Sequence, residues 1–252
     1  MLLNIAPFDT FDAELAQMIS GDSHINELIS IVRHDTTMLL NADAQKYRFW
    51  SFFQQFLLWE LRQVYTPQEQ AAVYSRAGLY YELHEDYEHA LRVFGEACGV
   101  SDRAETVIAF IQECLADLDS RTSSIADDNK PTALCAAATF RGGHGIAGVY
   151  ANNAVFATVN AKDVTVGYID AQKGVEVDKE QVLEWNPDLI VLDASNLGLV
   201  ENEYAEDPAF FESLNAVKNG ELYQWPNSTS NYTNVEIPLV NAYYIGSVMF
   251  PE

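Results

Sequence analysis

The residues best suited to binding chemistry lie in one glycine-rich turn of this 252-residue sequence. The stretch "TALCAAATFRGGHGIAGVY", residues 132–150, is typical of a buried strand that runs into such a turn. Arg141 offers a planar guanidinium, which pairs with carboxylates or anionic chelates through two hydrogen bonds. His144 can hydrogen-bond a ligand or coordinate a metal, and Phe140 could cover the apolar face of a ligand. Three glycines would let the backbone approach a ligand closely: Gly142, Gly143 and Gly145.

The same turn supports a second interpretation, a dinucleotide-binding fingerprint. Gly143, Gly145 and Gly148 fit the G-x-G-x-x-G pattern that cradles a pyrophosphate. Asp170 follows about 22 residues later, near where such a fold needs an acid for the ribose. The fingerprint also requires a helix to begin at its third glycine, and "VYANNAV" opens a helix poorly. A plain strained turn, with its charged side chains in solvent, is the structural alternative.

Two later loops would lie beside this turn, because the carboxyl ends of parallel strands meet at one edge of a sheet. Ser195 and Asn196 follow the apolar run "LIVLDAS" and would either contact a ligand or cap the next turn. In the stretch from 225 to 234, Trp225 and Tyr232 could stack on a flat or hydrophobic ligand. The predicted ligand-binding residues are therefore Phe140, Arg141, Gly142, Gly143, His144, Ser195, Asn196, Trp225 and Tyr232, with no catalytic residue, metal ligand or resident cofactor among the predictions.

The elements after residue 128 alternate between strands and helices at short spacing. This rhythm predicts an α/β lobe over 128–252, with a parallel sheet and helices on both faces. The continuous apolar run from 189 to 195 is typical of a parallel strand covered on both sides. The predicted strands are 132–140, 163–170, 189–195 and 221–226, and the predicted helices are 178–187, 207–220 and 237–250.

The first half of the chain is predicted to be mostly helical. Residues 47–61 are apolar almost all round, which predicts a helix buried against the rest of the chain or, alternatively, a subunit interface that makes a homo-oligomer. A helix begins at the cap Thr66 and closes at Gly78, and "LYYEL", residues 79–83, is a predicted short strand. A long helix begins at Ser101 and ends before a polar break at 126–131.

Composition narrows the classes of partner. The chain carries 37 acidic and 14 basic residues, a net charge of −23, so its surface is expected to repel phosphate backbones and anionic lipid, and nucleic acid is not an expected partner. The three cysteines follow no metal-ligand spacing and imply no disulfide framework. The start of the chain lacks the basic and apolar regions of a signal peptide, and no uncharged run approaches the ~18 residues of a transmembrane helix.

The order of motifs in the second half resembles a known family. "DKEQVLEWNPDLIVLDAS", "DPAFFESLNAVKNGELYQWP" and a last helix ending in "MFPE" closely resemble the C-terminal lobe of ABC-transporter substrate-binding proteins for iron complexes, siderophores, haem and cobalamin. "ALRVFGEACGVSDRAETVIAFIQECLADLDSRT" resembles the end of that family's first lobe and its interlobe helix. "KPTALCAAATFRGGHGI" resembles the first strand and cleft loop of its second lobe. The resemblance covers residues 65–252.

This resemblance implies two α/β lobes bridged by a rigid helix, with a ligand held in the cleft between them. It places an N-terminal lobe at 1–99, an interlobe helix at 100–127 and a C-terminal lobe at 128–252. It further implies an extracytoplasmic, periplasmic or membrane-anchored protein that captures an iron complex and delivers it to an ABC permease without catalysis.

The sequence also departs from the family pattern. The strand and cleft loop that open the family's first lobe are not found, because residues 1–62 are helical and aromatic instead. Either the chain is a fragment or processed form, or its first lobe has been rebuilt. Three functions therefore stay open: a solute-binding protein, a binding-inactive relative that acts as an interaction protein, and a dinucleotide-binding enzyme.

Overall fold

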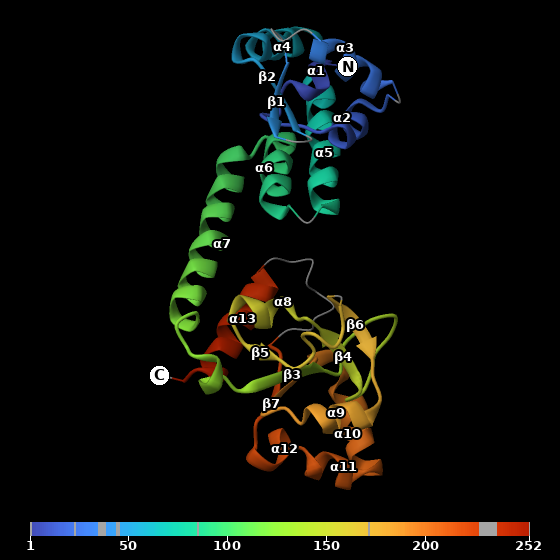
Figure 1. Cartoon of the computed structure of the whole chain (residues 1–252), viewed down its shortest axis with the longest axis vertical. Coiled ribbons are helices and arrows are strands. Elements are labelled where there is room, and N and C mark those ends of the chain that lie inside the picture. Colours follow the sequence, from blue (N-terminus) through green and yellow to red (C-terminus); the bar gives the residue numbers. More distant parts are fainter. Residues whose placement is uncertain are drawn as a thin grey trace. The chain divides into compact units, whose positions relative to one another are not determined.

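The computed structural model describes residues 2–22, 24–34, 39–43, 46–84, 86–170, 172–226 and 236–251. The chain divides into two compact units, Met1–Phe110 and Ile111–Glu252, with the division inside one long helix, α7 (Ser101–Thr122). Figure 1 labels most of the helices and strands of both units. Within the described residues, no helix combines the length and apolar character needed to cross a membrane.

Unit 1 is mostly helical, as predicted, with one small sheet. Its antiparallel strands β1 and β2 pair Leu39 with Phe49. Its core gathers aromatic and aliphatic side chains from α1, α2, β2, α4 and α5, among them Phe8, Phe11, Leu15, Phe49 and Val73. The elements are α1 (Leu2–Ile5), α2 (Ala13–Ser20), α3 (Ile25–His34), β1 (Leu39–Asp43), β2 (Lys46–Phe49), α4 (Ser51–Val64), α5 (Pro67–Leu83), α6 (Tyr87–Cys98) and the first part of α7.

The helix predicted from Thr66 is present, but it does not end at Gly78. Thr66 and Glu69 form the predicted capping box, and α5 then runs on through 79–83, so the predicted strand "LYYEL" is wrong. Gly78 has another role, since a Cβ built there would lie 2.5 Å from the ring of Phe94 on α6. Glycine at this position permits close packing of α5 against α6.

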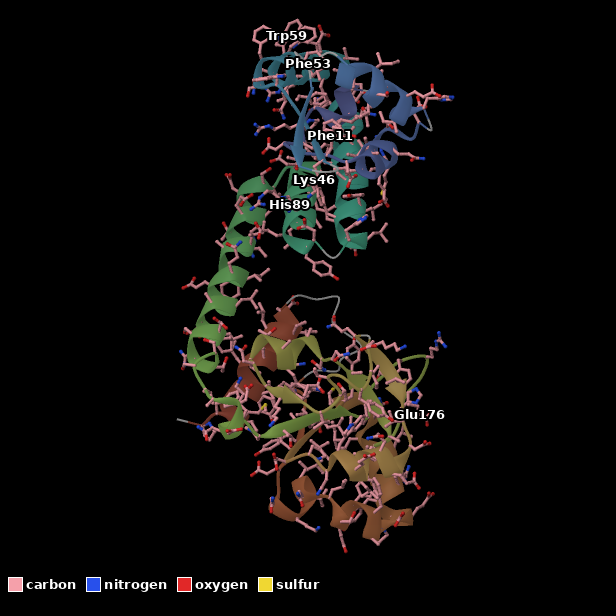
Figure 2. The ribbon with its side chains drawn as sticks, viewed as in Figure 1. Phe11, Lys46, Phe53, Trp59, His89 and Glu176 are labelled. Carbon is pink, nitrogen blue, oxygen red and sulfur yellow. The ribbon has the colours of Figure 1, made fainter. Side chains whose placement is uncertain are left out.

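The aromatic segment at 47–61 forms a strand end followed by α4, and α4 is not buried all round. Leu57 and Leu61 lie in contact with the unit 1 interior at 5% and 3% exposure. Phe52 and Trp59, by contrast, are 89% and 58% exposed. Figure 2 shows Trp59 at the periphery of this unit and Phe11 in its interior. The prediction of a fully buried helix is therefore wrong for this face of α4.

Unit 2 is built on a mixed sheet with the strand order β6-β4-β3-β7-β8, and the short β5 also pairs with β3. Strands β3, β7 and β8 are parallel, as predicted, and Cys135 pairs with Val191. The structure adds an antiparallel edge made by β4 and β6. The strands are β3 (Thr132–Ala136), β4 (Gly148–Ala151), β5 (Lys162–Asp163), β6 (Lys173–Glu176), β7 (Leu189–Leu192) and β8 (Leu222–Gln224).

Alternation along the central strands places a core on each face of this sheet. Leu134, Ile190 and Leu192 point to one core, which includes α9, α10 and α11. Cys135 and Val191 point to the other, which includes α7, α8 and α13. Successive side chains of a strand face opposite ways, so the predicted covering of both faces is confirmed. The helices are α8 (Ala154–Thr158), α9 (Lys179–Trp185), α10 (Leu197–Glu206), α11 (Pro208–Ser213), α12 (Asn215–Asn219) and α13 (Glu236–Met249).

Two element predictions in unit 2 need correction. The strand predicted at 163–170 is wrong beyond Asp163, because the chain turns there, with Thr165 donating from its amide and hydroxyl to the Asp163 carboxylate. The single helix predicted at 207–220 is two helices, α11 and α12, separated at Leu214, whose backbone is extended and whose side chain is fully buried.

Candidate ligand-binding loop edge

The turn after β3 has a backbone that deviates from ordinary allowed conformations. Ala137 and Arg141 have φ values of 55° and 49°, in the left-handed region that non-glycine residues rarely adopt. Gly142, with φ 126°, completes the turn by accepting a hydrogen bond at 3.0 Å from the amide of Phe140. Residues held this way persist only where their surroundings fix them. We call the segments 137–147 and 193–199, which follow β3 and β7, the loop edge.

Asn196 supplies the contact that fixes this turn. Its side-chain amide donates to the carbonyl of Ala137 at 2.7 Å and to the hydroxyl of Thr139 at 2.9 Å. Asn196 is buried, and Asp193 caps the same turn by accepting from the amide of Ser195 at 2.9 Å. The amide hydrogens of Asn196 thus bind the chain itself, while Ser195 is exposed beside them.

Two of the three fingerprint glycines pack against side chains that follow β7. A Cβ at Gly143 would meet the side-chain oxygen of Asn196, and one at Gly145 would meet the carboxylate of Glu203. Gly148 begins the strand β4, with no helix at that point. Because a dinucleotide fingerprint needs a helix N-terminus there for the pyrophosphate, the prediction of a dinucleotide site using Gly143, Gly145, Gly148 and Asp170 is wrong.

Phe140 and His144 form a stacked pair within the turn. Their ring centroids lie 3.8 Å apart with the planes 8° from parallel. The Nε2 of His144 donates to the carbonyl of Phe140 at 2.8 Å, which leaves Nδ1 3.8 Å from a carboxylate oxygen of Glu176 on β6. The Phe140 ring also lies against Gly174 of β6. The pair therefore ties the turn to the antiparallel edge of the sheet.

Arg141 is the side chain that this arrangement leaves available. It is exposed at the tip of the turn, and it makes no hydrogen bond or ion pair with any residue in the described part of the chain. Its left-handed backbone is fixed by the neighbouring contacts, so the side chain starts from a defined position at the tip of the turn. Such a group suits a carboxylate or another anionic ligand that accepts two parallel hydrogen bonds.

Trp225 does not face a ligand site. Its indole is fully buried, donates to the sulfur of Cys135 at 3.2 Å, and packs against Phe156 at 5.7 Å between ring centroids. Burial raises the pKa of the Cys135 thiol to about 12, which keeps it a neutral thiol. The prediction that Trp225 stacks on a ligand is therefore wrong, because its ring belongs to the core beneath the sheet. Tyr232 lies outside the described residues.

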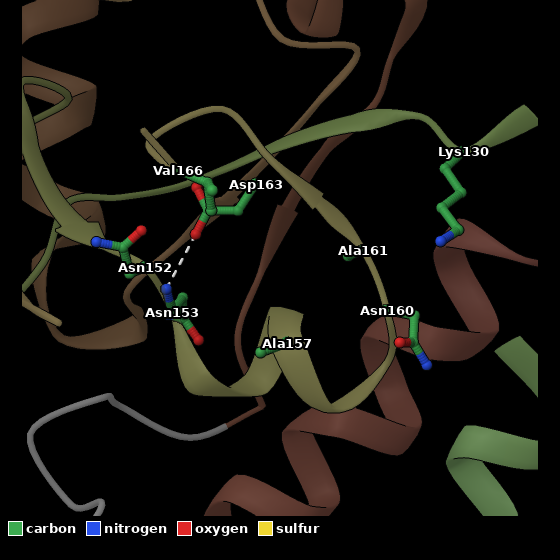
Figure 3. Close-up of a pocket in the computed structure, with 8 residues that line it drawn as sticks. All are labelled: Lys130, Asn152, Asn153, Ala157, Asn160, Ala161, Asp163 and Val166. Carbon is green, nitrogen blue, oxygen red and sulfur yellow. Dashed lines mark hydrogen bonds between the residues drawn. The ribbon is translucent and has the colours of Figure 1, made fainter. Parts of the chain in front are cut away.

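A polar cavity of about 340 Å³ lies at the other end of β3, and sequence reasoning missed it (Figure 3). Lys130 precedes β3, and Asp163 pairs with Ala133 at its amino end. Asp163 accepts from the amide of Asn153 at 2.9 Å, and Lys130 pairs with Asp127 at 2.8 Å. The signal in the sequence is the group of asparagines between 152 and 160. Among the lining residues, Asn153 and Asp163 bind each other, whereas Asn160 donates to Asp119 and Thr122 outside the lining. The buried Nδ2 of Asn153 has no hydrogen-bond partner among the described residues.

A comparison with family models identifies the chain. Residues 63–229 match the model described as periplasmic binding protein, which covers more than half of the sequence. The chain belongs to the periplasmic binding protein family. The match includes α5 to β8 and therefore the loop edge. A search of curated proteins finds no match.

Solved structures of the same kind share the fold. An ABC transporter solute-binding protein from Sulfurospirillum deleyianum is 17% identical with a TM-score of 0.53, over 67% of this chain and 52% of that one. The molybdate-binding protein MolA of Haemophilus influenzae is 15% identical with a TM-score of 0.51, over 71% and 56%. The haem-binding protein RhuT of Roseiflexus sp. RS-1 is 14% identical with a TM-score of 0.50, over 65% and 61%. This chain spans less than two thirds of each.

Proposed function

We propose that this protein is the solute-binding component of an ABC-type importer. In this function it captures a metal complex, such as a ferric siderophore, haem or a related chelate, and delivers it to a membrane permease without catalysing a reaction. It would work outside the cytoplasm, in the periplasm or held at a membrane. The observation that carries the proposal is the family match over residues 63–229, which contains the loop edge.

The chemistry of the loop edge supports an anionic ligand. Arg141 stands exposed on a turn that Asn196 and the Phe140–His144 pair hold in place. Because the backbone of the turn is already fixed, binding has to order only the Arg141 side chain and not the loop, which favours affinity. Iron chelates with carboxylate or hydroxamate groups, and the propionates of haem, offer oxygen acceptors that suit a guanidinium. Ser195 lies on the neighbouring loop as a second polar contact.

Calorimetry with the purified chain tests this proposal. Haem, a ferric hydroxamate siderophore, cobalamin and molybdate would be titrated separately into the protein. We expect one of the iron complexes to bind, and Arg141→Ala to weaken that binding by roughly tenfold to a hundredfold, as the loss of a charge-assisted contact requires. Arg103→Ala on α7 is the matched control, since Arg103 is also exposed, and it should leave the affinity unchanged.

A second function is favoured by one observation, the exposed aromatic face of α4. The chain would then be a relative that no longer binds solute and acts through its interactions. Folded protein that binds none of the four probes, tested at concentrations well above ordinary affinities for this class of ligand, would favour this second function over the first.

A further inference from the structure

We propose that the exposed aromatic face of α4 docks on the interfacial zone of a lipid bilayer. The face consists of Phe52, Phe56 and Trp59, which are 89%, 49% and 58% exposed. Their spacing of four and three residues places the three rings in one stripe along the helix. Tryptophan and phenylalanine on one side of a helix are typical of helices that lie in the membrane interface.

The opposite face of α4 is fastened to unit 1, so the stripe has a fixed direction. Leu57 and Leu61 are buried in the unit 1 interior. Gln54 donates from its side chain to the carbonyl of Ala6 at 3.1 Å and to that of Phe8 at 3.4 Å. The helix therefore cannot rotate to cover its aromatic stripe without breaking these contacts. The stripe stays on the surface of the unit.

The charges on either side of the stripe balance one another. On α4, the exposed Arg62 and the half-buried Glu60 flank the three rings. Repulsion by the acidic remainder of the surface is screened over about 8 Å at physiological salt. The rings can therefore enter a bilayer interface without a local excess of either charge beside them.

The size of the stripe argues for lipid over a second copy of the chain. The 14 residues of α4 make a helix about 21 Å long. A single stripe along it, about 10 Å wide, offers on the order of 200 Å², whereas a stable protein interface buries about 800 Å² on each partner. A bilayer needs no matching surface, and its interface accepts single aromatic rings. The proposal holds whether or not Arg141 binds a ligand.

Vesicle flotation tests the inference directly. The full chain would be mixed with phosphatidylcholine vesicles in physiological salt, and the bound fraction measured. We expect the wild type to float with the vesicles. Phe52→Ser and Trp59→Ser should each lower the partition coefficient on the order of tenfold, because each removes one inserted ring.

The matched control is Phe110→Ser, which removes an aromatic side chain of 59% exposure from α7 in the same unit, and it should leave partitioning unchanged. Circular dichroism confirms that the variants keep their fold. Absence of wild-type binding, or an equal loss with Phe110→Ser, would overturn the proposal. So would a dimer in sedimentation velocity that becomes a monomer with Phe52→Ser, since the stripe would then be covered by a second copy.

Discussion

At the scale of single residues, the loop edge is held by side chains that the sequence suggests for other purposes. The glycines of the turn admit Asn196 and Glu203, and Asn196 binds the backbone of the neighbouring loop. Glu203 accepts from the amide of Ile146 at 2.8 Å. The glycines that resemble a ligand-binding fingerprint thus support the turn by close packing. Arg141, at the tip of the turn, is the residue that stays exposed.

Gly145→Ala should displace the carboxylate of Glu203. A Cβ there would overlap that carboxylate, which accepts a hydrogen bond from the amide of Ile146, so loss of this bond is expected to lower the free energy of unfolding by about 1–3 kcal/mol. Gly198 in α10 is the matched control, because a Cβ there meets nothing within 4 Å. Gly198→Ala should be neutral or stabilising by up to about 1 kcal/mol. Urea unfolding of both variants checks the contrast, and equal effects would contradict it.

Alanine substitutions at Asn196 and at its neighbour Ser195 should change the free energy of unfolding by very different amounts. Asn196→Ala leaves the Ala137 carbonyl and the Thr139 hydroxyl without their donor, which should cost about 1–3 kcal/mol of unfolding free energy. Ser195→Ala removes an exposed hydroxyl and should change it by less than about 0.5 kcal/mol. Hydrogen exchange would show faster exchange in residues 138–143 only for Asn196→Ala. Unchanged exchange there would mean that the turn is fixed in another way.

At the scale of elements, close packing explains the errors in sequence-based assignment. "LYYEL" has the aromatic and apolar content of a strand, but α5 is already propagating and packs along α6 through Gly78. The helix at 207–220 divides because the Leu214 side chain is fully buried and its backbone is extended. The packing of Gly78 against α6 and the burial of Leu214 both depend on residues outside the segment. The periodicity of the segment therefore could not reveal them.

The contact between α13 and α7 should depend on pH. Tyr243 donates to a carboxylate oxygen of Asp117 at 2.9 Å. Burial and this hydrogen bond raise the pKa of Tyr243 from its ordinary value of 10 to about 12. Because the raised value belongs to the folded state, the stabilisation is complete below pH 10 and is lost as pH rises toward about 12. Unfolding free energy measured across this range should fall.

The same contact should also weaken in acid. Arg121 and Tyr243 lower the pKa of Asp117, so its contribution is present above the ordinary carboxyl value and disappears as pH falls through the lowered one. Tyr243→Phe should make the alkaline fall smaller but not remove it, because the pKa values of Tyr80, Tyr81 and Tyr223 are also raised in the folded protein. Tyr244→Phe is the control and should leave the fall unchanged, and a fall of wild-type size in Tyr243→Phe would contradict the prediction.

At the scale of the whole molecule, the two units have separate cores. The unit 1 core contains Ile19, and one core of unit 2 contains Ile190, both without exposed surface. The two units should therefore unfold as distinguishable transitions in calorimetry. Ile19→Ala should lower the free energy of unfolding of unit 1 alone, by about 2–5 kcal/mol. Ile190→Ala should lower that of unit 2 alone by a similar amount. A single transition that both variants shift equally would contradict this.

The sequence by itself determined the α/β character of unit 2, because apolar runs and alternating strands and helices are local patterns. It also determined the helical character of unit 1, the capping box of α5 and the position of Arg141 after a strand. The sequence did not determine which roles the glycines and asparagines have within the turn. Their partners, such as Gly145 with Glu203, are far apart in the chain.

Only the tertiary structure decided which side chains are available to a ligand or partner. It buried Trp225 against Cys135, engaged Asn196 with Ala137, and left Arg141 exposed. It likewise turned Leu57 inward and Trp59 outward on α4. Burial depends on what packs against each face of an element, and that is set by contacts distant in sequence. Residue type therefore indicated the chemistry, and packing decided where it can act.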